Sequence, residues 1–481
     1  MHSRRGPARR IAAALATLAS LALIAQPVLE DRRELEGRFS VDPGKAPNVI
    51  IFLTDDQAIG TMSVMPRTRD WFGAHGRTFS NGYVTTPQCC PSRATIMTGR
   101  YSHNHGVENN ALTFNFDQDH SLQEYLQDAG YRTALYGKFL NEWKYDLTHF
   151  DSWATNNGNE RYYDGRWNVD GERMTIPDYS TDYIEQRSLD FIEDGEENDD
   201  QPWYLYVSVM APHTPFQPEK DYENAPIPKW HRNHAQPEVS RKDKPGYVRH
   251  SDADLKRAAE IRALQLRSLM SVDDLVDGVM NELQRLGESK DTLAFFMSDN
   301  GYVLGDHGLL GPIASKGNPY TPSIKVPMYM RWPGHIPEGE TDPRLAANVD
   351  LFPTILDAAG FPKDERPVLD GESLLKDSQR SQLLTEYRHT PKTDTPSWAS
   401  IRTDTYQYVE YYGFESNVTT IDPFTPAIDP EVTFSEFYYL KADPDQNHNI
   451  LADDSTKNDP DIEALHAQLE RDRNCSGATC P

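Results

Sequence analysis

Three stretches of the chain are continuously apolar and rich in β-branched or aromatic residues: 48–54, NVIIFLT; 203–210, WYLYVSVM; and 292–298, TLAFFMS. None of them alternates regularly between apolar and polar positions, as a strand with one solvated face would. Each stretch therefore predicts a strand that is buried on both faces, which is typical of the interior of a parallel sheet.

Apolar residues at helical spacing lie between these predicted strands. Residues 121–130 begin with Ser121 and Glu124 at the spacing of a capping box and end at Gly130, so they predict a short helix. Residues 252–287 keep the helical spacing and predict a long helix. A helix that bends near Ser271 is the alternative to a straight one. Strands that alternate with helices predict an α/β fold, with a large and mostly parallel sheet sandwiched by helices.

The pattern changes near residue 385. Residues 398–412 and 436–450 are aromatic and alternating, with a loop rich in Pro and Asp between them. They predict a smaller antiparallel sheet that packs on the main domain, followed by a short helix at 460–469. We therefore expect a leader segment at 26–46, a main domain at 47–384 and a C-terminal subdomain at 385–481.

The first 25 residues resemble an export signal. Arginines precede an apolar run at 11–25, and small residues near Ala22 and Ala25 suit a signal peptidase. The run is shorter than the roughly 20 residues of a membrane-spanning helix, and no other segment is apolar enough to span a membrane. We expect a signal peptide at 1–25 and a secreted, extracellular protein, and the export route stays open. Cys475 and Cys480 then fit a disulfide in a short terminal loop, because exported proteins meet an oxidising compartment.

The 481-residue chain is acidic, with a formal net charge of −26. This charge argues against nucleic acid as a partner, because binding to phosphates needs a basic surface. An anionic substrate would have to be met by a local basic pocket. Residues 228–257 are locally basic, with eight Lys or Arg against four Asp or Glu. They predict a surface loop, and contact with an anionic polymer is the alternative.

Acidic pairs follow two of the predicted strands. Asp55 and Asp56 come directly after the first, and Asp299 and Asn300 come directly after the third. Ligands gather at the carboxyl ends of parallel strands, and carboxylates brought together there repel one another unless a cation lies between them. Oxygen ligands select Ca²⁺ or Mg²⁺ over zinc. The alternative is a pair of ordinary Asp-rich turns.

Two of the four cysteines, Cys89 and Cys90, are adjacent. Neighbouring cysteines are poor disulfide partners, because the peptide bond between them strains the bridge. Pro91 suits the first position of a helix that continues to Gly99. Cys89 would then lie just before a helix N-terminus, where backbone N–H groups favour an anion, and Arg93 can bind a tetrahedral oxyanion with two N–H groups. A metal, a helix N-terminus and an arginine together predict a site for a sulfate or phosphate ester.

The stretch around these cysteines resembles the signature of type I sulfatases, which belong to the alkaline-phosphatase-like superfamily. Cys89-Cys90-Pro91-Ser92-Arg93, followed by Thr98-Gly99-Arg100, is similar to the family pattern Cys-x-Pro-Ser-Arg with a later Thr-Gly-Arg. In that family a formylglycine-generating enzyme oxidises the first cysteine. The resemblance therefore implies that Cys89 becomes formylglycine, the nucleophile, and that Cys90 is a packing residue. It extends from residue 47 to residue 450.

The same resemblance assigns further residues. It implies one bound Ca²⁺ rather than Mg²⁺, with the ligands Asp55, Asp56, Asp299, Asn300 and the modified Cys89. It also implies sulfate-binding and acid–base groups, namely Lys138, His213 and Lys316. In the implied mechanism a hydroxyl of hydrated formylglycine attacks sulfur. Arg93 and the two lysines hold the sulfonyl oxygens, and Lys316 or His213 protonates the leaving alcohol.

Within the family, the chain is most similar to N-acetylglucosamine-6-sulfatases, which implies a sulfated carbohydrate as the substrate, with activity on aryl sulfates. The residues that carry this similarity and offer hydrogen bonds to a sugar are His105, Asn109, Asn110 and Asn141. The alternative is that the asparagines bind loop backbone near the site. The chain departs from many arylsulfatases at Leu140, Thr321 and Pro322, which leaves the substrate assignment open.

Two other functions fit many of the same residues. A phosphate or phosphonate monoester hydrolase of the same superfamily also binds a tetrahedral anion, so the lysines and Arg93 do not exclude it. A noncatalytic glycan-binding protein derived from this fold would be expected to have lost a metal ligand or the nucleophile, and all nine matched positions are present.

Overall fold

The computed structural model describes eight stretches of the chain. They are residues 41–42, 44–156, 161–196, 201–236, 240–311, 314–390, 393–413 and 431–481. The predicted signal peptide at 1–25 and most of the predicted leader segment at 26–46 lie outside these described residues. Within them, no helix has both the length and the apolar character needed to cross a bilayer.

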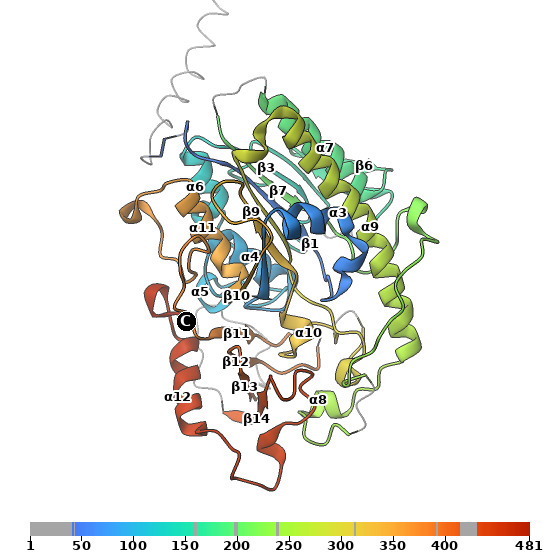
Figure 1. Ribbon diagram of the computed structural model, residues 1–481, viewed down its shortest axis with the longest axis vertical. Coiled ribbons are helices and arrows are strands. Elements are labelled where there is room, and N and C mark those ends of the chain that lie inside the picture. Colours follow the sequence, from blue (N-terminus) through green and yellow to red (C-terminus); the bar gives the residue numbers. More distant parts are fainter. Residues whose placement is uncertain are drawn as a thin grey trace, which may run out of the picture.

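A ten-stranded, mostly parallel sheet forms the centre of the main domain (Figure 1). Its strands are β1 Asn48–Thr54, β2 Arg77–Tyr83, β3 Arg132–Gly137, β4 Ser152–Thr155, β5 Gly165–Val169, β6 Glu172–Ile176, β7 Trp203–Ser208, β8 Thr292–Ser298, β9 Met328–Arg331 and β10 Glu340–Ala347. Their spatial order is β10-β2-β9-β8-β1-β7-β3-β4-β5-β6. The run from β8 to β4 in this order is parallel throughout. The three strands predicted from apolar runs are β1, β7 and β8, which adjoin at the centre of the sheet, so this prediction is confirmed.

The side chains of β1 explain why the central strands are apolar throughout. Val49, Ile51 and Leu53 belong to a core shared with helices α4 (Cys89–Thr98), α6 (Leu122–Asp128) and α11 (Leu351–Ala358). Ile50 and Phe52 belong to a second core, shared with α7 (Ser180–Glu196) and α9 (Leu255–Leu286). Helices therefore cover both faces of the sheet (Figure 1), as the pattern predicted.

The predicted helices are present, with differences at their ends. The long one is α9, a single helix that Asp254 caps and that continues through Ser271. The short one is α6. Ser121 precedes it, but the Ser121 hydroxyl donates to the carbonyl of Gln118 at 2.5 Å and does not cap the first turn. The hydrogen bond that the predicted capping box expects from Ser121 is therefore absent. The shorter helices of the main domain are α3 Pro66–Thr68, α5 Ser102–His105, α8 Gly246–Arg249 and α10 Thr321–Ile324.

A smaller antiparallel sheet follows, as the aromatic alternation predicted. Its strands are, in spatial order, β11 Leu383–Tyr387, β12 Trp398–Arg402, β13 Tyr406–Tyr412 and β14 Val432–Tyr439, and helix α12 (Ile462–Arg473) comes after them. Trp398 and Tyr411 share a core with Tyr83 of the main domain, so the two sheets pack together. Cys475 and Cys480 form the expected disulfide. The division at residue 385, which falls inside β11, stays a prediction.

Candidate active site

Four neighbouring strands place side chains at one edge of the sheet. Their order is β8-β1-β7-β3, and all of them are parallel. The side chains that follow them are Asp55 and Asp56 after β1, Asp299 and Asn300 after β8, His213 after β7 and Lys138 after β3. Because the carboxyl ends of parallel strands lie at the same edge, residues that are far apart in the sequence meet there.

Three carboxylates of this group are buried together. Asp55, Asp56 and Asp299 are each at most 1% exposed, and the backbone N–H of Asp56 donates to Asp299 Oδ1 at 3.2 Å. Burial and the charge of Asp55 raise the pKa of Asp299 to about 6. Ligand atoms of Asp55, Asp56, Cys89 and His213 all lie within 4.8 Å of one another. Carboxylates this close favour a cation between them.

Asn300 gives a second indication of a metal. Its Nδ2 donates to Asp56 Oδ1 at 2.7 Å and to the carbonyl of Gly301 at 2.9 Å. Its Oδ1 is buried and has no hydrogen-bond partner among the described residues. Leaving a buried acceptor unpaired costs free energy, whereas an amide oxygen is a common ligand of Ca²⁺. The donors present therefore fit a cation that prefers oxygen.

Helix α4 places Cys89 at its first position. Gln88, the residue before it, is extended. The helix thus begins two residues earlier than predicted, and Pro91 lies within the first turn, where its missing N–H breaks no helical hydrogen bond. Asn110 Oδ1 accepts a hydrogen bond from the N–H of Cys90 at 3.0 Å and so satisfies a donor of this turn. Gly99 ends the helix with a φ of 64°, as predicted.

The thiol of Cys89 lies between a cation and a carboxylate. Its Sγ is 3.1 Å from Lys316 Nζ and 3.6 Å from Asp55 Oδ1. Burial raises the pKa of this thiol well above its usual value, so an unmodified Cys89 stays protonated and is a weak nucleophile. Cys90 belongs to the hydrophobic core of the main domain. Cys89 is therefore the cysteine that belongs to the site.

Two buried lysines pair with the carboxylates. Lys138 Nζ donates to Asp55 Oδ2 at 2.5 Å. Lys316 Nζ donates to both carboxylate oxygens of Asp56, at 2.7 and 2.9 Å. Burial opposes the charged form of Lys316, but the negative charge of Asp56 outweighs it and holds the pKa of Lys316 well above its usual value. Lys316 is thus a fixed positive charge next to Cys89.

Arg93 links three strand ends. Its Nε donates to Asp299 Oδ2 at 2.8 Å, and its Nη1 donates to Ser208 Oγ at 2.6 Å and to the carbonyl of Lys138 at 2.7 Å. Its Nη2 is buried 3.5 Å from Asp55 Oδ2 and has no hydrogen-bond partner among the described residues. Since a guanidinium has five N–H donors, only those of Nη2 are left for the predicted oxyanion contact.

His213 presents its Nε2 to the site. Its Nδ1 lies 2.8 Å from the carbonyl of Thr214, and a carbonyl only accepts, so Nδ1 carries a hydrogen and donates it. Its Nε2 lies 3.6 Å from Asp56 Oδ2. Nε2 is therefore the nitrogen at which His213 can take up or release a proton within the site.

Two of the predicted sugar-binding residues have partners in the protein interior. His105 Nε2 lies 3.1 Å from Thr95 Oγ1, and its Nδ1 accepts from the N–H of Val107 at 3.1 Å. Burial lowers the pKa of His105 to about 3. Asn109 is fully buried, and its Oδ1 accepts from the N–H of Ala111 at 2.9 Å. Contacts of this kind agree with the alternative in which these side chains satisfy loop backbone.

The other two predicted sugar-binding residues differ from each other. Asn110 uses its Oδ1 on helix α4, as described above. Asn141 has a buried Oδ1 without a hydrogen-bond partner among the described residues. Its backbone N–H donates to Cys90 Sγ at 3.2 Å, which places Asn141 beside the signature cysteines. Asn141 is thus the residue of the four whose side chain keeps an unused acceptor near the site.

The loop that carries Lys316 depends on residues that sequence reasoning missed. The carbonyl of Gly317 accepts from Trp398 Nε1 at 2.8 Å, and the N–H of Gly317 donates to the carbonyl of Pro87 at 2.9 Å. Gly317 has a φ of 74°, and a Cβ at this position would lie 2.8 Å from the ring of Tyr387. Trp398 and Tyr387 belong to the C-terminal sheet, which therefore fixes an active-site loop of the main domain.

A parallel sheet that gathers buried carboxylates, lysines and a cysteine on a helix N-terminus at one edge provides the charges that a hydrolase of a tetrahedral anionic ester needs. Comparison with protein families identifies the family. The family model described as "Sulfatase" matches residues 47–361, and the one described as "N-sulphoglucosamine sulphohydrolase, C-terminal" matches residues 305–474. The chain belongs to the sulfatase family and is a sulfuric ester hydrolase.

Curated relatives and solved structures agree with this assignment. The N-acetylglucosamine-6-sulfatase of Homo sapiens is 32% identical over an alignment of 501 positions, which covers 92% of this chain and 88% of that protein. The putative extracellular sulfatase Sulf-1 homolog of Caenorhabditis elegans is 38% identical over an alignment of 353 positions, which covers 68% of this chain and 48% of the length of that relative. A structure solved in complex with its substrate, D-glucosamine-2-N,6-O-disulfate, has a TM-score of 0.73 at 24% identity and covers 89% of this chain and 97% of its own. This last similarity shows the fold.

Proposed function

We propose that the chain is a secreted sulfatase that removes a sulfate ester from a carbohydrate. The leading substrate is 6-sulfated N-acetylglucosamine, and small aryl sulfates are incidental substrates. One observation carries the proposal: three carboxylates, two lysines and Cys89 are buried together at the carboxyl edge of the sheet. The substrate follows from relatives named N-acetylglucosamine-6-sulfatase, which match most of the chain.

The proposal includes a formylglycine at position 89, which a formylglycine-generating enzyme supplies during biosynthesis. Formylglycine supplies a hydrated aldehyde, in which one hydroxyl can attack sulfur and the other lets sulfate leave without attack of water on sulfur. Support comes from the environment of Cys89, because a buried and protonated thiol is a weak nucleophile. Lys316 Nζ, 3.1 Å from Sγ, stabilises negative charge on whichever group occupies that position.

The proposal also includes one Ca²⁺. The residues that would hold it are Asp55, Asp56, Asp299, Asn300 and the side chain at position 89. A divalent cation here supplies positive charge beside the sulfonyl oxygens and lowers the pKa of the nucleophilic hydroxyl. The unpaired Oδ1 of Asn300 supports a metal. The number of protein oxygens favours Ca²⁺, since Mg²⁺ usually keeps several of its waters.

The fixed cations suit the sulfonyl oxygens. Lys138 and Lys316 keep their positions through Asp55 and Asp56, so they need no rearrangement when charge develops on the oxygens. Arg93 offers Nη2 to an oxygen and also positions Asp299. The leaving alcohol needs a proton, and both His213 Nε2 and Lys316 Nζ lie beside Asp56, where either can supply it.

Among the proposed sugar contacts, Asn141 has the most support. Its buried Oδ1 is unpaired among the described residues, and a sugar hydroxyl is a donor that would satisfy it. His105, Asn109 and Asn110 have less support, because the hydrogen bonds given above already use both ring nitrogens of His105 and the side-chain oxygens of the two asparagines. A sugar bound near Asn141 would lie beside the cysteine pair.

Secretion is proposed on two observations. The disulfide between Cys475 and Cys480 fits an oxidising compartment. The relative of Caenorhabditis elegans is named an extracellular sulfatase. The signal peptide expected at 1–25 is part of this proposal.

Peptide mass spectrometry tests the nucleophile. The peptide that contains Cys89 and Cys90 should show a loss of about 18 Da at Cys89, the difference between a thiol and an aldehyde. A loss at Cys90 would show that the signature is aligned one residue off. Protein made without a generating enzyme should fold and be nearly inactive.

Kinetics on matched esters test the substrate. We expect kcat/KM to be highest for 6-sulfated N-acetylglucosamine, lower for an aryl sulfate, and lowest for the corresponding aryl phosphate and phosphonate. Asn141→Ala should lower the value for the sugar and leave the aryl sulfate nearly unchanged. Preference for the phosphonate would favour the phosphonate hydrolase, and sugar binding without turnover by the modified protein would favour the glycan-binding alternative. Equal losses on both sulfates would exclude Asn141 as a sugar contact.

A further inference from the structure

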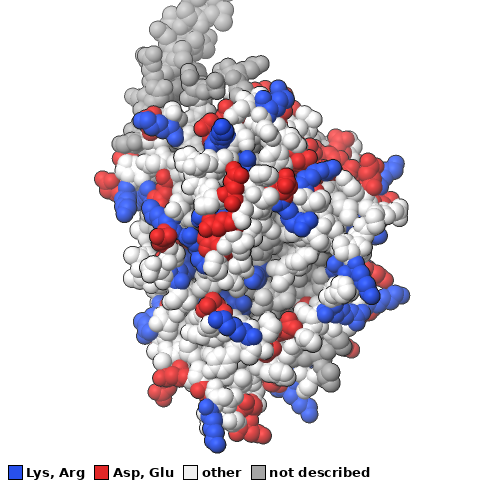
Figure 2. Space-filling view, viewed as in Figure 1, with Lys and Arg blue, Asp and Glu red and all other residues white. Residues whose placement is uncertain are grey.

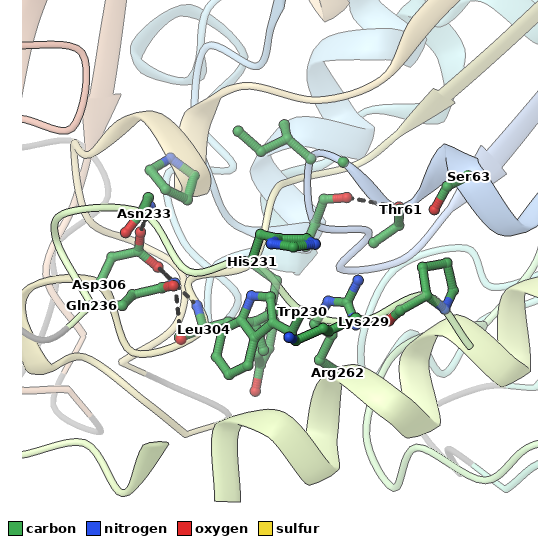
Figure 3. A pocket seen from close by; sticks show the side chains of 16 residues that line it. Thr61, Ser63, Lys229, Trp230, His231, Asn233, Gln236, Arg262, Leu304 and Asp306 are labelled. Carbon is green, nitrogen blue, oxygen red and sulfur yellow. Dashed lines mark hydrogen bonds between the residues drawn. The ribbon is translucent and has the colours of Figure 1, made fainter. Parts of the chain in front are cut away.

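A cavity opens between helix α9 and the loop at 228–236. Its volume is about 370 Å³, within the range of small-molecule sites. Its lining includes the buried side chains of Ala58, Tyr302 and Leu304, together with residues of the loop and Arg262 of α9 (Figure 3). None of these residues has been given a role in the site above.

This cavity lies next to the candidate active site. Ala58 comes two residues after Asp56, and Tyr302 comes two residues after Asn300. Two residues span at most about 7 Å even when fully extended, so both lining residues stay within that distance of proposed metal ligands. The ring of Tyr302 also packs edge-on against Phe216, with centroids 5.9 Å apart. The cavity is therefore close enough for one oligosaccharide to enter both places.

Cationic and aromatic side chains surround the cavity. Figure 3 shows Lys229, Trp230, His231 and Arg262 around the same space. Lys229 and His231 are exposed, and Trp230 is half-buried. Arg262 Nη1 donates to the carbonyl of Pro228 at 3.1 Å and so fastens the loop to α9. The lining thus offers a flat aromatic ring with the cationic side chains of Lys229 and Arg262 beside it.

The carboxylate in the lining is already engaged. Asp306 Oδ1 accepts from Asn233 Nδ2 at 2.5 Å, and its Oδ2 accepts from Gln236 Nε2 at 2.6 Å (Figure 3). Through these two hydrogen bonds, Asp306 holds the loop at 228–236 in its conformation. The lining also contains two cationic side chains, Lys229 and Arg262, so its formal charge is net positive. The whole chain has a formal net charge of −26.

Lys and Arg side chains also lie on the surface near the cavity. Figure 2 shows Lys and Arg side chains over the lower part of α9 and the neighbouring loop, whereas Asp and Glu gather toward the upper end of α7 and α9. A local positive region beside a cavity can attract an anionic ligand even when the whole protein is acidic.

We propose that this cavity binds a second, anionic sugar residue of a sulfated oligosaccharide while the ester of a neighbouring residue occupies the active site. The inference rests on the proposed function, since it needs a carbohydrate in the active site. Trp230 gives the apolar C–H face of a sugar ring a flat surface, and Lys229 and His231 can reach a sulfate or carboxylate at its edge. An acidic polymer would then meet a basic cavity in an otherwise acidic protein.

Calorimetric binding tests the inference without turnover. The protein is the full chain with Cys89→Ala, whose methyl side chain has no thiol or hydroxyl that could be oxidised to formylglycine. The ligands are 6-sulfated N-acetylglucosamine and its β1,4-linked tetrasaccharide. We expect the tetrasaccharide to bind about tenfold more tightly than the monosaccharide, and Trp230→Ala or Lys229→Ala to remove most of this gain. Affinity for the monosaccharide should stay within about twofold.

Matched controls separate a local effect from a general one. Tyr439→Ala removes another aromatic ring, 44% exposed, from the C-terminal sheet, and Lys457→Ala removes another exposed positive charge. Both should keep the tetrasaccharide gain. The gain in the unmutated cavity should also shrink as salt is raised, because salt screens exposed charges.

Three outcomes would overturn the inference: equal binding of the two ligands, no binding of either, or an unchanged gain in the cavity variants. The proposed function is measured separately, as kcat/KM on an aryl sulfate with formylglycine at position 89. There Trp230→Ala and Lys229→Ala should stay within about twofold of the unmutated protein. A failure of the aryl sulfate assay alone would count against the proposed function.

Discussion

The hydrogen bond from Trp398 to Gly317 allows a direct test of whether the C-terminal sheet supports catalysis. Trp398 is 1% exposed, and its Nε1 donates to the carbonyl of Gly317 at 2.8 Å. Gly317 is the neighbour of Lys316 in the sequence. Trp398→Phe keeps an aromatic ring in the core but removes the donor, so the carbonyl of Gly317 loses this partner.

The expected size of the effect comes from that carbonyl. A buried acceptor left without a partner costs about 1–3 kcal/mol. For a chain of 481 residues, the entropy of unfolding is about 1 kcal/mol/K, so this cost corresponds to a fall in Tm of about 1–3 °C. If the loop shifts by about 1 Å, Lys316 moves relative to position 89, and kcat/KM falls by about 10–100-fold.

Trp203→Phe is the matched control. Trp203 is 3% exposed, and its Nε1 has no hydrogen-bond partner among the described residues. This variant therefore loses the same atoms without breaking a bond of this kind. Thermal unfolding and aryl sulfate kinetics of both variants give the comparison. Equal changes in Tm and in kcat/KM would mean that the bond to Gly317 does not position Lys316, and that the loss of ring volume explains both results.

Three further predictions concern the metal and a buried ion pair. Asp299→Ala should abolish turnover while the C-terminal sheet stays folded, as measured by kinetics and circular dichroism. Removal of the metal with EDTA should abolish aryl sulfate turnover, and added Ca²⁺ should restore it. His103 Nδ1 lies 3.0 Å from both carboxylate oxygens of Glu386. Burial opposes both charges, but each partner outweighs it, so the pKa of His103 is raised to about 9 and that of Glu386 is lowered to about 2. The contribution of His103 to the free energy of unfolding should be complete below pH about 6.5 and should be lost as the pH rises through about 9. The contribution of Glu386 should be lost as the pH falls from about 4.5 through about 2. Tm measured against pH should show both declines, and His103→Gln should flatten the alkaline one.

The centre of the fold could be predicted because a strand buried on both faces is apolar in its own residues. β1, β7 and β8 are strands of this kind, and the acidic pairs after β1 and β8 could be placed with them. β6 is different, because four of its five residues are exposed. Its place in the sheet comes from pairing with β5, and a strand that buries few side chains gives little apolar signal.

Contacts between distant residues set the remaining details of the site. The local pattern placed Pro91 first in its helix, yet the helix begins at Cys89, where Asn110 satisfies the N–H of Cys90 from 20 residues away. Trp398 and Gly317 are 81 residues apart. A pattern read over one helical turn or one strand does not include such partners, so the ligand types could be predicted while their supports could not.

The pairing of charges indicates what the proposed metal would add to this site, besides its lysines and arginine. Each buried carboxylate has a different nearest cation: Asp55 and Lys138 at 2.5 Å, Asp56 and Lys316 at 2.7 Å, and Asp299 and Arg93 at 2.8 Å. Paired one to one, these groups can be buried without a large uncompensated charge, so the protein can fold before a metal arrives. The same pairing leaves no excess positive charge for the anion of a sulfate monoester. A divalent cation bound here would add that excess at one point in the protein interior, where salt screens charges least. For this reason, EDTA is expected to lower the affinity for inorganic sulfate far more than it lowers Tm.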